Sequence, residues 1–180
     1  MINIRIILTL LTITLGIFLV MCIQGKLETH ASPLGIVSLE FANSQKRITE
    51  IKDQWTLNGM LERARTNIRM DYLFIPFYAM LFYTLCGTIS VRMHRGWAKL
   101  GVLLAFGALV AGLLDAGENL LMLLALRGIS SNSTAVLTSV LAGVKFLLLG
   151  LAALYVIPLG LRILILKAAG RNPAPHYDRS

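Results

Sequence analysis

The chain has 180 residues, of which 56% are hydrophobic and 14% are charged. Soluble domains carry about 45–50% apolar and about 25% charged residues. This difference excludes a disordered chain, a disulfide-stapled secreted domain and an ordinary soluble enzyme, so we expect a one-domain integral membrane protein. The net charge is +8. Because the basic residues flank apolar runs, their expected partners are the headgroups of membrane lipids and not nucleic acid.

The first apolar run has the length of a membrane-spanning helix. Ile6–Ile23 comprises 18 residues. A signal-peptide core has about 7–15 residues, whereas about 20 residues cross a bilayer. We therefore predict a retained span over residues 4–24.

The segment 25–69 is predicted to hold two short amphipathic helices. Asn43 or Ser44 could cap the first. Its apolar residues recur at helical spacing among charged ones: Ile48, Ile51 and Trp55. Asn58 is expected to cap the second. That helix carries three further apolar residues: Leu61, Ala64 and Ile68. We interpret the pair as closing the outer end of the bundle; the functional alternative is a lid over a lipid-facing cleft.

Three more apolar runs follow, over 70–90, 100–126 and 134–157. Each reaches the length that crosses about 30 Å of hydrocarbon. Each is predicted to be a helix, because backbone groups cannot stay unpaired in lipid. The expected fold is all-α: a four-helix transmembrane bundle over residues 1–169, with short amphipathic helices in the first outer loop. Residues 170–180 are expected to form a mobile cytoplasmic tail.

Basic residues predict the orientation of the spans. They gather in the second link and after the fourth span: Arg92, Arg95, Lys99, Arg162, Lys167, Arg171 and Arg179. The link between the third and fourth spans holds only Arg127. The positive-inside rule then puts both termini in the cytoplasm. In a bacterial cell the protein would lie in the inner membrane.

Small residues on the third span predict close helix packing. Ala108, Gly112 and Ala116 repeat every four residues and share one face. Such residues let a neighbouring backbone approach closely. Gly143 and Gly150 on the fourth span are the expected counterparts.

Ionisable residues inside the spans are the main functional signal. Each costs at least about 2.5–3.5 kcal/mol at the centre of a bilayer. Asp115 and Glu118 lie in the third span and Lys145 lies in the fourth. Counted from the outer ends of their helices, Asp115 is about 18 Å deep and Lys145 about 16 Å deep. Matching depth on consecutive antiparallel helices predicts an ion pair between them.

The charges of this group do not balance. Two carboxylates, Asp115 and Glu118, accompany one ammonium, that of Lys145. Either one carboxyl keeps its proton or another cation joins the group. Arg69 and Arg127 are the candidates that could reach in from the outer rim.

The second span adds Asp71 and Tyr78, which are seven residues apart and share a helix face. We expect them to face Glu118 and Asn119. The candidate site is thus a polar pocket open toward the outer leaflet: Asp71, Tyr78, Asp115, Glu118, Asn119 and Lys145. The alternative interpretation is a buried ion pair that only fixes helix packing.

The motifs of common cofactor and metal sites are missing from the sequence. The three histidines, His30, His94 and His176, lie outside the predicted spans. There is no HExxH, P-loop or GxGxxG motif. We therefore expect no metal and no cofactor.

Three sequence blocks resemble those of small bacterial integral membrane proteins that have four spans and no assigned function. The blocks are Gly35–Ala42, Asp71–Tyr78 and Asp115–Leu120. The resemblance would cover most of the chain. It implies that the outer loop and the acidic face of the third span belong to one site, and it lends no substrate or catalytic residue.

The preferred functional hypothesis is binding of a lipid or small amphiphile at the acidic pocket. One alternative is a lipid-modifying enzyme that uses Glu118 or Asp115 as general acid or base, tuned by Lys145. A proton- or cation-coupled carrier is disfavoured, because four spans show no inverted repeat. A homo-oligomer could supply the missing half.

Overall fold

The computed structural model describes residues 4–23 and 26–170. Within these ranges its regular elements are all helices. They are α1 (Ile4–Ile23), α2 (Ile36–Glu40), α3 (Gln45–Leu57), α4 (Leu61–Ser90), α5 (Arg95–Leu126) and α6 (Asn132–Ala168). Four of them, α1, α4, α5 and α6, are long and apolar enough to cross a membrane. The predicted all-helical chain with four long apolar helices is confirmed, and the protein is an integral membrane protein. The predicted mobile tail lies, from residue 171 onward, outside the described residues.

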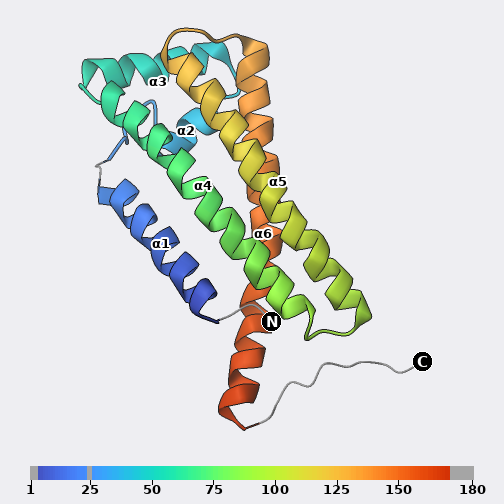
Figure 1. Ribbon diagram of the computed structural model, residues 1–180. Helices are drawn as coiled ribbons and strands as arrows, with labels where there is room; N and C mark the ends of the chain where they lie inside the picture. Colours follow the sequence, from blue (N-terminus) through green and yellow to red (C-terminus); the bar gives the residue numbers. More distant parts are fainter. Residues whose placement is uncertain (1–3, 24–25, 171–180) are drawn as a thin grey trace.

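The long helices do not pack equally (Figure 1). Helices α4, α5 and α6 pack against one another, with α6 crossing behind the other two in this view, whereas α1 runs along α4. Only Thr14 of α1 is buried. Helix α1 is therefore the most loosely held wall of the bundle.

Helices α2 and α3 close one end of the bundle, beside the loop that joins α5 to α6 (Figure 1). Ser44 caps α3, as predicted, by accepting a hydrogen bond from the Arg47 backbone N–H at 3.3 Å. Trp55 is fully buried. Its indole N–H donates to the Leu27 carbonyl at 2.9 Å and to Ser32 Oγ at 3.0 Å. These bonds fasten the segment after α1 to the end of the bundle.

The second amphipathic helix is not a separate element, and Asn58 does not cap it. Asn58 follows the last turn of α3 as its C-cap, and Gly59 makes the turn with φ 66°. Helix α4 begins at Leu61 and continues to Ser90 with Pro76 inside it. Asparagine suits either helix end, so its type alone could not decide between them. Between Leu61 and Pro76, α4 contains no residue that would break a helix, so the predicted second helix continues directly into the span.

Gly112 of α5 packs against α4, whereas Gly107 and Gly117 face Leu148 and Leu141 of α6. A Cβ added at Gly112 would lie 3.2 Å from the Ala79 Cβ and 3.3 Å from a methyl carbon of Ile75. The predicted close approach is therefore present. The expected counterparts were wrong, because Gly143 and Gly150 are exposed and an added Cβ would meet nothing within 4 Å.

Gly101 marks a second close approach and gives a stability test. A Cβ there would lie 2.8 Å from the Ser90 Cβ and would also meet the Tyr155 ring. That ring is held in place because its hydroxyl donates to the Trp97 carbonyl at 3.0 Å. We expect Gly101→Ala to lower the free energy of unfolding by about 1–3 kcal/mol in a detergent titration. Gly117→Ala is the control, because its nearest heavy atom would be 3.8 Å away. Equal stability of the two variants would contradict this packing.

Candidate functional site

Lys145 of α6 lies at the centre of a buried ionic cluster. Its Nζ is 2.9 Å from Asp115 Oδ1 and 2.8 Å from Glu118 Oε2, both on α5. It is also 3.8 Å from Glu40 Oε2 on α2. None of these four side chains is more than 10% exposed. The ion pair expected between Asp115 and Lys145 is present, and two further carboxyls join it.

The face of α5 explains why both of its acids point at Lys145. Asp115 and Glu118 are three residues apart and so project from one side of the helix. Ala108 and Gly112 are buried on that side. Because this face is turned into the protein, the carboxyls meet an ammonium instead of acyl chains, which offsets part of their desolvation.

A second set of hydrogen bonds joins α4 to α5. The Tyr78 hydroxyl donates to Asp115 Oδ2 at 2.7 Å. The Asn119 amide donates to Asp71 Oδ2, also at 2.7 Å. The expected contact of α4 with Asn119 is therefore present, but Tyr78 binds Asp115 and not Glu118. Asp115 accepts from both partners because each uses a different oxygen: Lys145 donates to Oδ1 and Tyr78 to Oδ2.

Glu40 is the cluster member that sequence reasoning missed. It lies in the five-residue helix α2, and the Ser139 hydroxyl of α6 donates to its backbone carbonyl at 3.0 Å. Its side chain is buried, and Oε2 accepts no hydrogen bond from the described residues. The available signal was an isolated acid between Leu39 and Phe41 in an apolar segment.

The charge balance differs from the expectation. Arg69 and Arg127, the cations expected to reach in, are both exposed. Long side chains at the rim of a span can keep their charge in water and need not reach the interior. A third carboxyl, that of Glu40, comes close to Lys145 instead. Burial raises the pKa of Glu40 above its ordinary value, and this rise is opposed by Lys145.

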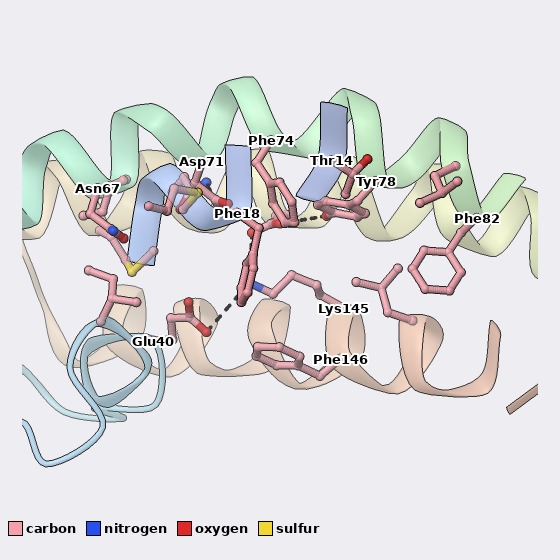
Figure 2. Close-up of a pocket in the computed structure, with 18 residues that line it drawn as sticks. Thr14, Phe18, Glu40, Asn67, Asp71, Phe74, Tyr78, Phe82, Lys145 and Phe146 are labelled. Carbon is pink, nitrogen blue, oxygen red and sulfur yellow. Dashed lines mark hydrogen bonds and ion pairs between the residues drawn. The ribbon is translucent and has the colours of Figure 1, made fainter. Parts of the chain in front are cut away.

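A cavity of about 360 Å³ borders the cluster (Figure 2). Its polar lining includes Glu40, Asp71, Tyr78, Asp115, Asn119 and Lys145. Its aromatic lining comes from three helices: Phe18 of α1, Phe74 and Phe82 of α4, and Phe146 of α6. The predicted site residues therefore meet at one cavity, with the exception of Glu118. Glu118 contacts Lys145 but is fully buried and does not line the cavity.

Comparisons with known proteins identify no relative. No family model, curated protein or solved structure matches the chain. The resemblance to small bacterial four-span proteins stays a prediction. Among the described residues, no three His, Cys, Asp or Glu side chains are placed to hold a metal ion.

Removing the central ammonium tests how much the fold depends on it. Lys145→Met leaves the Asp115 and Glu118 carboxyls buried without their cation. We expect the free energy of unfolding to fall by about 3–5 kcal/mol, measured by detergent titration. Lys46→Met is the control, since Lys46 is exposed and its replacement should change stability by less than about 0.5 kcal/mol. A stable Lys145→Met protein would show that the cluster does not hold the bundle together.

The raised pKa of Glu40 should make the stability of the protein depend on pH. Its pKa is raised above 4.5 in the folded protein, so the unfolded chain releases this proton at lower pH. The stability contributed by Glu40 is full below that value and declines as pH rises through the raised pKa. We expect Glu40→Gln to remove this part of the slope in unfolding titrations across that window. Ser38→Ala, a neutral change in the same helix, should keep the wild-type slope; the same slope in all three proteins would contradict the prediction.

Proposed function

We propose that the protein binds a lipid or small amphiphile within its membrane domain. The polar end would lie against the ionic cluster and the apolar chain along the aromatic wall. The observation that carries this proposal is the cavity of about 360 Å³, which is largely apolar and includes a few charged side chains in its lining. Ligand cavities are typically apolar with a few convergent polar groups.

The apolar wall supports an amphiphilic ligand. The rings of Phe18 on α1 and Phe74 on α4 lie 6.3 Å apart, and those of Phe74 and Tyr78 lie 5.2 Å apart. Helix α1 packs mainly against α4, and only Thr14 of it is buried. A small displacement of α1 would therefore open the cavity to the bilayer without breaking the α4–α5–α6 core.

The cavity also separates the functional hypotheses. A purely structural ion pair requires the direct contact of Asp115 with Lys145, which is present. It does not require the same two side chains to line an apolar cavity. An enzyme using Glu118 as acid or base would need that carboxyl at the cavity surface, and it is not among the lining residues. Asp115, the other acid considered for this role, lines the cavity, but its two oxygens are engaged by Tyr78 and Lys145. Binding accounts for both observations.

We also propose that both termini lie in the cytoplasm, with the protein in a bacterial inner membrane. The α4–α5 link and the end of α6 lie at the opposite end of the bundle from α2 and α3 (Figure 1). Four of the basic residues that predict orientation belong there: Arg92, Arg95, Lys99 and Lys167. Such residues favour the cytoplasmic side.

Filling the cavity tests the proposed function. Thr14 of α1 lines it, whereas Thr12 of the same helix is exposed, and both hydroxyls donate to the carbonyl four residues earlier. We expect Thr14→Trp to lose a bound amphiphile that the wild type and Thr12→Trp retain. Native mass spectrometry of mildly extracted protein measures the bound mass. Retention of the same mass by Thr14→Trp would contradict binding at this cavity.

A further inference from the structure

We propose that the cavity selects an amphiphile whose polar end is a positively charged amine or quaternary ammonium. This inference rests on the proposed binding function and names the chemical class of its ligand. It follows from the charge of the cluster, from the hydrogen bonds that the cluster leaves unmade, and from the aromatic rings around the cavity.

The cluster has more acid than base. Glu40, Asp115 and Glu118 surround Lys145, and Asp71 lies beside them through its bond to Asn119. Four ionised carboxyls and one ammonium would carry a net charge of −3. Lys145 is the only Lys or Arg among the described residues that line the cavity. A ligand cation would offset this excess, whereas an anionic headgroup would add to it.

Lys145 is not free to bind an anionic headgroup. An ammonium has three N–H donors. Two short contacts, to Asp115 at 2.9 Å and to Glu118 at 2.8 Å, engage it from the side of α5. Glu40, at 3.8 Å, lies on a further side. The lysine is thus enclosed by carboxyls of its own chain.

One buried acceptor beside the cavity, by contrast, is left without a hydrogen bond. The Glu40 side chain is nine-tenths buried and lines the cavity. Its Oε2 accepts no hydrogen bond from the part of the chain that the structure describes. A buried acceptor without a hydrogen bond lowers stability. A ligand amine in the cavity would satisfy it and would place its charge beside the surplus carboxyls.

The aromatic wall fits a cation as well as an alkyl chain. The Lys145 Nζ already lies 4.8 Å from the centroid of the Phe146 ring. Phe18, Phe74 and Tyr78 contribute further rings to the same cavity. The faces of aromatic rings attract ammonium groups, and quaternary ammonium ligands are commonly bound in this way.

Anionic amphiphiles have a better place elsewhere on the protein. A second cavity, of about 710 Å³, lies among the first residues of α1, the end of α4 and the last turns of α6. Arg92 and Lys167 line it together with apolar side chains. The two cavities therefore have opposite charge. If a negatively charged probe binds the protein, its affinity should change on substitution of Arg92 and not on substitution of Glu40.

The test uses four probes with one chain length: octylammonium, octyltrimethylammonium, octanol and octanoate. The full-length protein in nanodiscs of zwitterionic lipid is titrated by calorimetry, and protein-free nanodiscs supply the background. We expect both cations to bind about tenfold more tightly than octanol, as expected for a charge-assisted contact. Octanoate should not bind this cavity.

Two acid variants assign the selectivity. Glu40→Gln should bring the affinity for octylammonium to within about twofold of that for octanol. Glu50→Gln is the matched control, because Glu50 is exposed and pairs with Arg47 away from the cavity. Thermal unfolding verifies that each variant is folded. If Glu40→Gln does not fold, Asp71→Asn is tested instead. It should also lower the affinity for octylammonium relative to that for octanol.

The possible results separate this inference from the proposed function. Equal binding of octanol and octylammonium, abolished by Thr14→Trp but unchanged in Glu40→Gln, overturns the cation preference and leaves amphiphile binding intact. The cation preference is also overturned if octanoate binds most tightly of the four probes and Thr14→Trp abolishes its binding. Absence of saturable binding for every probe overturns both.

Discussion

The ammonium of Lys145 is the charge on which this structure depends. It connects α6 to α5 through Asp115 and Glu118 and draws α2 inward through Glu40. In hydrocarbon each of these charges would be costly alone, so the helices must stay in the one register that brings them together. The hydrogen bond of Tyr78 to Asp115 extends this constraint to α4. One buried cation thus fixes the relative positions of three spans and of the short helix that covers their end.

The ion pair could be predicted from the sequence because depth in a membrane can be counted. Asp115 and Lys145 lie at similar distances from the ends of consecutive antiparallel helices, and in the structure they are in contact. Glu40 could not be found in this way, because its position depends on the tertiary contact of α2 with Ser139. Asn58 was assigned to the wrong helix because asparagine favours both ends of a helix. Local sequence therefore predicted the spans and the pair, but not how the outer loop folds back onto them.

The walls of the cavity differ in how firmly they are held. Residues of α2, α4, α5 and α6 form the polar wall, where each helix is tied to another by hydrogen bonds or ion pairs. Helix α1 forms the opposite wall with apolar side chains and buries only Thr14. Regions with few buried contacts open most readily. A ligand from the bilayer would accordingly displace α1, while the charged groups that receive it stay in place.

The surplus of carboxyls is the reason for which we propose that this cluster serves more than packing. One acid is enough to pair with one buried lysine, and Asp115 already does so at 2.9 Å. Glu118 Oε1 and Glu40 Oε2 are buried oxygens that accept no hydrogen bond from the described residues. Such groups lower stability, and proteins keep features of this kind mainly where a function uses them. Because Glu40 lines the cavity while Glu118 contacts Lys145 from behind the lining, the unmatched charge lies next to the space that the proposed cation would occupy.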